Sequence, residues 1–224
     1  PGDLTKDGEK SSHLLFASHL NELVSSGIQV FVTPGNHDIL NPHAKGFLGD
    51  TTYPVATVTP ADFAYIYQDM GYAKALSRDT HSLSYVAEPL PGLWILAIDA
   101  CVYAEEVSAP PTGGRIRKET REWAWSILYQ ARQRGITVLG LMHHGIIEHF
   151  PGQKQLFTDY VIDDWASVAA SLADQGLKVM FTGHFHAHDI VSAVTPAGAV
   201  LYDIETSSLV QYPCWMRMCR LSDG

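Results

Sequence analysis

Cysteine is scarce in this sequence: there are 3 in 224 residues, and no two of them have the CxxC spacing of a metal or redox motif. A disulfide framework or a thiolate zinc site is therefore not expected, and the cysteines are read as small buried hydrophobic residues. Long apolar runs are also missing, since none approaches the roughly 18 residues that a membrane-spanning helix requires. No signal peptide is recognised at the start of the chain either.

Basic residues are outnumbered, with 15 lysines and arginines against 24 aspartates and glutamates, which gives a formal net charge of −9. Binding to a nucleic-acid backbone is not expected, because it requires a basic face. A phosphorylated small molecule stays possible as a partner, because bound metal cations can reverse the local sign of the field. The length and the 46% hydrophobic content are those of one folded domain, taken as residues 1–224.

Short apolar runs alternate with helical patterns along the chain. Helices are expected over residues 9–26, 60–70, 118–134 and 163–175. Strands are expected over residues 28–33, 83–87, 93–98, 136–142, 177–182, 190–194, 200–204 and 215–221. Residues 39–58 are expected to be irregular, and Leu15 and Leu23 are assigned to the apolar face of the first helix. This order predicts a mixed α/β domain whose sheet is parallel early and antiparallel late.

Polar side chains gather where the predicted strands end. The segment GNHD (35–38) follows IQVFVT, the pair His143-His144 follows ITVLGLM, and GHFH (183–186) follows LKVMFT, while GD stands at residues 2–3. Loops at the carboxyl ends of parallel strands form the binding crevice of α/β sheets. Imidazole, carboxylate and amide oxygen suit zinc, manganese, iron or nickel better than a metal that prefers thiolates. The sequence therefore predicts a metal site at this edge of the sheet.

The motifs GD, GNHD, a strand-end histidine and GHxH, in this order, resemble those of the calcineurin-like metallophosphoesterases. The resemblance extends from residue 2 to about residue 204. It implies a four-layer α-β-β-α sandwich and two divalent metal ions, drawn from manganese, iron, zinc and nickel. It also implies cleavage of a phosphomonoester or phosphodiester by a hydroxide that bridges the two ions.

The resemblance assigns five metal ligands. Asp3 matches the aspartate that bridges the two ions. Asn36, His143 and His184 match the ligands of the second ion, and His186 matches a ligand of the first. His143 is preferred to its neighbour for this role because it directly follows the strand. The neighbour is then expected to support a ligand rather than to bind the ion.

The resemblance also assigns catalytic roles to GNHD. His37 matches the histidine that contacts the phosphoryl group and protonates the leaving alkoxide, and Asp38 matches its orienting partner. Asp7 matches no ligand position. His149, on the loop after the strand-end histidines, is expected either to be solvated or to face the substrate.

A different metallohydrolase class has to be weighed at residues 184–189. The metallo-β-lactamase signature is H-x-H-x-D-H, whereas this chain has H-x-H-x-H-D near its end, and GNHD has no place in that fold. His188 is therefore read as a loop residue that does not bind the ion.

The resemblance departs from the family pattern at the beginning of the sequence. The family begins with a strand that ends in D-x-H, and this sequence begins at Pro1, directly before GD. We expect an N-terminally truncated piece of a longer chain, in which the first ion keeps only Asp3 and His186. An enzyme and a catalytically silent scaffold used for protein binding are the two hypotheses. The enzyme is favoured, because every ligand position visible here and His37 are present.

Overall fold

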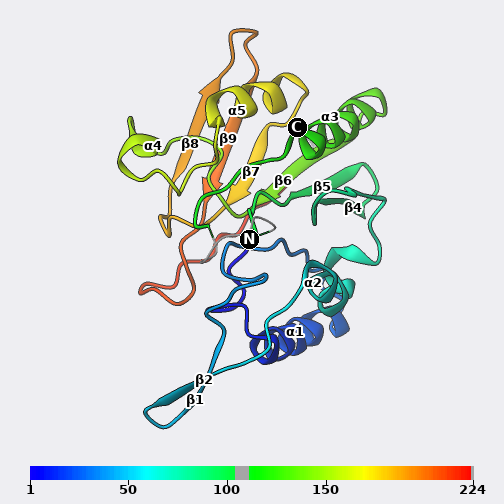
Figure 1. Cartoon of the computed structure of the whole chain (residues 1–224). Helices are drawn as coiled ribbons and strands as arrows, with labels where there is room; N and C mark the ends of the chain where they lie inside the picture. Colours follow the sequence, from blue (N-terminus) through cyan, green and yellow to red (C-terminus); the bar gives the residue numbers. More distant parts are fainter. Residues whose placement is uncertain (104–110, 223–224) are drawn as a thin grey trace.

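The computed structural model describes residues 1–103 and 111–222 (Figure 1). Its helices are α1 (Lys10–Ser25), α2 (Pro60–Ile66), the π-helical turn η1 (Gln68–Tyr72), α3 (Lys118–Gln133), α4 (Gln153–Leu156) and α5 (Trp165–Asp174). Its strands are β1 (Lys45–Leu48), β2 (Thr51–Pro54), β3 (Ser77–Arg78), β4 (Tyr85–Leu90), β5 (Leu93–Ile98), β6 (Thr137–Met142), β7 (Val179–Thr182), β8 (Ile190–Val194) and β9 (Val200–Glu205).

The described strands form a seven-stranded mixed sheet, in the order β3-β4-β5-β6-β7-β9-β8, and a separate hairpin of β1 and β2. The centre, from β5 through β6 and β7 to β9, is parallel, whereas β3, β4 and β8 pair antiparallel at the two edges. The expectation of a parallel part followed by an antiparallel part is therefore wrong. A tight turn joins β4 to β5, while α3 and α5 provide the long crossovers that parallel pairing requires.

Helices cover both faces of the sheet. On one face, Leu96 and Ile98 of β5 pack into a core with side chains of α3 and α5. On the other face, Ala97 of the same strand packs into a second core with α1, α2 and η1. Successive side chains of a strand point to opposite faces, so a strand covered on both sides must be apolar throughout. The expected α/β class is confirmed, with helical layers on either side of the strands (Figure 1).

Two expected strands are not formed. Residues 28–33 have no strand pairing in the described part of the chain, and the backbone N–H of Val32 donates instead to the carbonyl of Met70 at 3.3 Å. Residues 215–221 also lie outside the strands. An apolar, β-branched run does not suffice, because a strand exists only where a neighbouring strand accepts its hydrogen bonds. The region expected to be irregular, in turn, contains the β1–β2 hairpin, which projects from the body of the molecule in Figure 1.

Some expectations about burial are also wrong. Leu15 and Leu23 are exposed, and the buried residues of α1 are His13 and Ala17. The helix thus presents to the core a different face from the one its leucines suggested. Of the cysteines, Cys101 is buried, while the two near the end of the chain are exposed and do not pair. No helix within the described ranges combines the length and hydropathy needed to cross a bilayer.

Candidate metal centre

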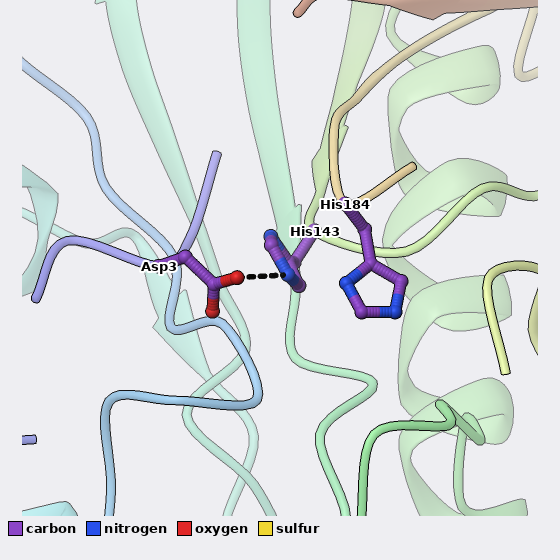
Figure 2. A group of neighbouring side chains, drawn as sticks. All are labelled: Asp3, His143 and His184. Carbon is purple, nitrogen blue, oxygen red and sulfur yellow. Dashed lines mark ion pairs between the residues drawn. The ribbon is translucent and has the colours of Figure 1, made fainter. Parts of the chain in front are cut away.

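The loops after β6 and β7 bring two histidines together with an aspartate from the beginning of the chain. Asp3, His143 and His184 each offer a ligand atom, and these atoms all lie within 4.8 Å of one another (Figure 2). Asn36 joins them, because its Oδ1 atom lies 3.1 Å from Nε2 of His143. The structure thus brings together four of the five residues expected to bind metal.

Glycines allow the loops to approach this closely. A Cβ atom on Gly2 would lie 2.4 Å from Nδ1 of His143, so no larger residue fits there without displacing the ring. Asp3 and His184 both have positive φ angles, of 50° and 72°, a conformation that side-chain-bearing residues rarely adopt. Such backbone conformations persist where the surrounding structure imposes them, and they cluster at functional sites.

The backbone around the two histidines determines which ring nitrogen is free. Nδ1 of His143 lies 2.8 Å from the carbonyl oxygen of Pro1, and Nε2 of His184 lies 3.2 Å from that of Asp159. A carbonyl oxygen only accepts, so each of these nitrogens carries a proton and donates. The opposite nitrogens therefore present lone pairs when the rings are neutral. Metal-binding histidines are held in the same way by a carbonyl on the second ring nitrogen.

The lone pair of His143 faces two oxygen atoms rather than a donor. Its Nε2 atom is 3.2 Å from Oδ2 of Asp3 and 3.1 Å from Oδ1 of Asn36. Three electron-rich atoms at such distances repel one another unless a positive charge lies between them. A second proton on the imidazole or a divalent cation provides that charge. Carboxylate, amide oxygen and imidazole are a donor set that fits a divalent ion such as Zn²⁺ or Mn²⁺.

The protonation states also suit metal binding. Burial and the neighbouring His143 lower the pKa of His184 to about 3, so its ring is neutral near pH 7. Burial alone would raise the pKa of Asp3. When the ring of His143 carries a second proton, its hydrogen bond to Asp3 and that from the backbone N–H of His37 outweigh burial and hold the pKa of Asp3 well below its usual range. The centre therefore offers a neutral imidazole and an ionised carboxylate, the forms that bind metals.

His144 lies behind the centre rather than in it. Its ring centroid is 4.4 Å from that of His184, and its Nε2 atom lies 3.0 Å from the carbonyl oxygen of Thr112. Burial lowers the pKa of His144 well below its usual value. The ring therefore packs as a neutral group against a candidate ligand.

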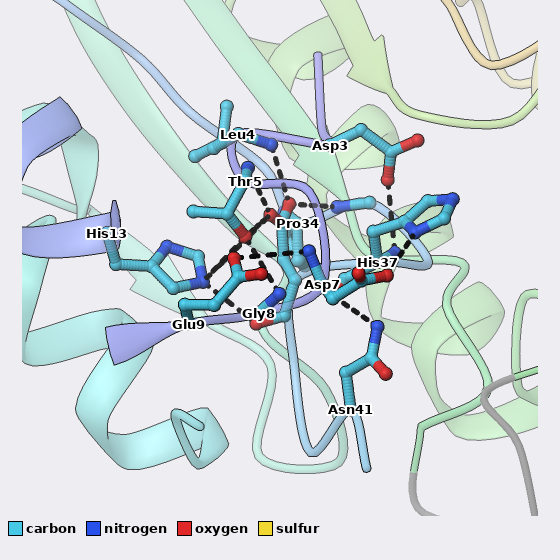
Figure 3. Close-up of polar contacts among 12 residues, drawn as sticks. Asp3, Leu4, Thr5, Asp7, Gly8, Glu9, His13, Pro34, His37 and Asn41 are labelled. Atoms are coloured by element: carbon cyan, nitrogen blue, oxygen red, sulfur yellow. Dashed lines mark hydrogen bonds and ion pairs between the residues drawn. The ribbon is translucent and has the colours of Figure 1, made fainter. Parts of the chain in front are cut away.

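His37 lies at the exposed rim of the centre. Its backbone N–H donates to Oδ1 of Asp3 at 3.1 Å, and its side chain is 47% exposed, so the ring can reach a bound molecule. The carboxylate beside its ring is that of Asp7, with 3.7 Å between Nδ1 and Oδ1 (Figure 3). Sequence reasoning missed Asp7, and the only available signal was its place on the same loop as the GD motif.

Asp38 is placed differently from its expected role as the orienting partner of His37. Its carboxylate is fully buried and accepts the backbone N–H groups of Leu4, Thr5 and Gly35 at 3.1, 3.0 and 2.9 Å. The hydroxyl of Thr5 donates to the same carboxylate at 3.0 Å. Asp38 therefore joins the loop that carries Asp3 to the loop that carries GNHD.

His186 and His188 do not join the group. Both side chains are exposed, and His186 is absent from the set of converging ligand atoms in the described residues. His186 nevertheless has a positive φ of 61° and lies two residues beyond His184 on the same loop. Its position near the centre is compatible with a ligand for a second ion, but the structure does not bring it into the first group.

A second cluster of charged groups was missed by sequence reasoning. The side chain of His149 is almost fully buried, contrary to the expectation of a solvated residue, with Nδ1 3.1 Å from Asp189 and Nε2 3.7 Å from Asp203 and 3.5 Å from Glu205. Burial opposes its charge, yet these carboxylates raise the pKa of His149 to about 9. The cluster links the loop after β6 to β9, and thereby supports the loop that carries His143.

Comparison with known protein families finds a match over most of the chain. The sequence model described as calcineurin-like phosphoesterase matches residues 1–188, a range that contains the whole group of candidate ligands. A search of curated proteins finds no match.

Proposed function

This chain belongs to the calcineurin-like phosphoesterase family, and we propose that it is an active metal-dependent hydrolase of a phosphomonoester or phosphodiester. Members of the family are in general hydrolases that bind divalent metals. The observation that carries the proposal is that ligand atoms of Asp3, His143 and His184 lie within 4.8 Å of one another, with Oδ1 of Asn36 3.1 Å from His143.

The four converging residues would hold one divalent ion. Asp3 offers a carboxylate oxygen, Asn36 its amide oxygen, and His143 and His184 their unprotonated ring nitrogens. A second ion would share Asp3 and take His186. Bound in this way, divalent ions lower the pKa of a water molecule and offset charge on the phosphoryl oxygens.

The residues of the chain then divide the remaining work. His37, at the exposed rim, would contact the phosphoryl group and give a proton to the leaving oxygen. Asp7, whose Oδ1 atom lies 3.7 Å from Nδ1 of His37, would help to hold the ring at that rim. Asp38 would act at a distance from the reaction, by fixing the two loops whose residues meet at Asp3. Neither a cysteine nor a serine is required as the nucleophile.

The proposal is tested by measuring metal binding and hydrolysis in parallel. The purified protein is stripped with a chelator and titrated with Mn²⁺ or Zn²⁺ in a calorimeter. It is then assayed with p-nitrophenyl phosphate and bis(p-nitrophenyl) phosphate. We expect binding of at least one ion and turnover of at least one ester. His143→Ala and His184→Ala should each weaken the binding by more than about tenfold and abolish turnover.

His19→Ala is the matched control, because this exposed histidine on α1 lies outside the centre. It should bind metal and turn over substrate as the unmodified protein does. Metal binding without turnover of either ester would support the alternative, a catalytically silent scaffold. Unchanged metal binding in both His143→Ala and His184→Ala would show that the assigned centre is wrong.

A further inference from the structure

The chain after β9 returns to the edge of the sheet where the metal centre lies. The backbone N–H of Thr206 donates to the carbonyl of Thr182, the last residue of β7, at 3.1 Å. Further along, Nη2 of Arg217 donates to the carbonyl of Glu205, the last residue of β9, at 2.8 Å. The segment 206–217 is therefore fastened at both ends to strands whose carboxyl ends form the crevice.

This segment and the loop after His184 line an open pocket of about 240 Å³. Its lining includes His186 and His188 from the loop, and Ser207, Gln211, Tyr212 and Trp215 from the segment. His186 is also the residue proposed to bind the second ion, so the pocket borders the proposed position of that ion. A drug-sized ligand needs more than about 300 Å³, so a pocket of this size suits one small ring system.

The chemistry of the lining fits a flat ring that carries polar atoms. The rings of His188 and Trp215 lie 5.7 Å apart with 34° between their planes, and they form an aromatic wall. Tyr212, which is 94% exposed, adds a third ring to the lining. Flat heteroaromatic rings stack on such side chains, and each stacked base contributes substantially to binding.

One buried polar group in the same lining lacks a partner that a ligand would supply. The hydroxyl of Ser207 is buried, and within residues 1–103 and 111–222 it has no hydrogen-bond partner. A buried polar group without a partner is unfavourable, and most such groups in proteins are satisfied by protein, water or ligand. The Gln211 side chain lines the same pocket and offers both a donor and an acceptor.

We infer that this pocket binds a planar heteroaromatic ring in the organic part of the phosphoester, with Trp215 as its main stacking surface. The inference rests on the proposed function, because the ring is placed relative to a phosphoryl group at the metal centre. It goes further by naming a specificity site outside that centre. It also assigns the segment 206–217 to substrate selection.

The test compares two diesters that share one leaving group. Methyl p-nitrophenyl phosphate and thymidine 5′-(p-nitrophenyl phosphate) both release p-nitrophenol, so only the second arm differs. We expect the thymidine ester to have the higher kcat/KM. Trp215→Ala should lower the ratio of the two kcat/KM values roughly tenfold, mainly through KM, as expected for the loss of one stacked ring. Trp215→Phe should restore most of the ratio.

Tyr129→Ala on α3 is the matched control, because Tyr129 is 53% exposed and Trp215 is 54% exposed. It should leave the ratio unchanged. Equal kcat/KM for the two esters, or an unchanged ratio in Trp215→Ala, would overturn the inference about the pocket. Turnover of the esters would still support the proposed function in that case.

Failure of the proposed function is separated by a binding measurement. If neither ester is hydrolysed, ligand-detected NMR with thymidine 5′-monophosphate still reports contact of the ring with the protein. Binding signals from the base protons of the nucleotide that are weaker with Trp215→Ala and unchanged with Tyr129→Ala would support binding of the ring in this pocket. Signals that are the same in all three proteins would overturn it.

Discussion

A Cβ atom on Gly35 would lie 2.1 Å from both the backbone nitrogen and the Oδ1 atom of Asp3. Real Cβ atoms do not lie this close to other atoms, so no side chain fits between Gly35 and Asp3. Gly35→Ala is expected to displace Asp3, to lower metal affinity at least tenfold and to destabilise the fold by about 1–3 kcal/mol. Calorimetric titration with Mn²⁺ and thermal unfolding measure the two effects.

Gly113→Ala is the control for this prediction. Its Cβ atom would meet its nearest neighbour, Oδ1 of Asp159, at 3.4 Å, an ordinary contact distance. Both measurements should match the unmodified protein. A Gly35→Ala variant with unchanged metal affinity would show that the position of Asp3 does not depend on this contact.

His37→Ala should lower kcat by about 10²–10⁴-fold and leave metal content unchanged. The ring is half exposed and is absent from the group of converging ligands, so its removal opens no metal position. The loss should be smaller for aryl phosphates, whose leaving groups need little protonation. Turnover of an aryl and an alkyl ester, with metal analysis of the same samples, makes the comparison. If kcat fell by the same factor for the two esters, His37 would only position the substrate and would not protonate the leaving group.

Asp38→Ala is expected to act on stability more than on the chemical step. The carboxylate accepts four hydrogen bonds from the neighbouring loops, and its removal leaves the buried N–H groups of Leu4, Thr5 and Gly35 without a partner. Each buried donor left unpaired costs about 1–3 kcal/mol, so a total loss of several kcal/mol is expected. Denaturant unfolding measures it. A variant of full stability with strongly reduced kcat would instead restore Asp38 to a catalytic role.

Local pattern was sufficient for much of the fold. The helix expected from Pro60 begins there, with Thr59 and Asp62 forming a capping box, and the apolar runs of β5, β6 and β7 form the parallel centre of the sheet. These features depend on residues close in sequence. The run at 28–33 is also apolar and β-branched, yet within the described residues it has no strand partner, because pairing depends on a distant segment that the run itself does not specify.

In the candidate centre, too, some residues could be predicted from the sequence and others could not. The order of the motifs placed Asp3, Asn36, His143 and His184 on strand-end loops, and the structure brings these four together. Which carboxylate lies beside His37 depends on how two loops pack, so neighbourhood in sequence pointed to the wrong aspartate. The cluster around His149 likewise depends on Asp203 of β9, which lies more than fifty residues further along the chain.

His149 and the carboxylates around it should control how the stability of the fold depends on pH. Burial opposes the charge of His149, but Asp203, Asp189 and Glu205 raise its pKa from about 6.5 to about 9. A raised pKa stabilises the folded state fully below pH 6.5, and this contribution is lost as the pH rises through 9. Burial also raises the pKa of Glu205, to about 8, so its deprotonation lowers the free energy of unfolding in the same direction.

His149→Gln should therefore be less stable than the unmodified protein by at most about 3 kcal/mol at pH 6, and the gap should close by pH 10. Denaturant unfolding of both proteins at the two pH values measures it. His19→Gln, at an exposed histidine of α1, controls for the general loss of an imidazole and should show no gap at either pH. A gap of the same size at pH 6 and pH 10 would mean that His149 contributes by packing alone. The raised pKa assigned to it would then be wrong, because only a charged imidazole among carboxylates makes the contribution depend on pH.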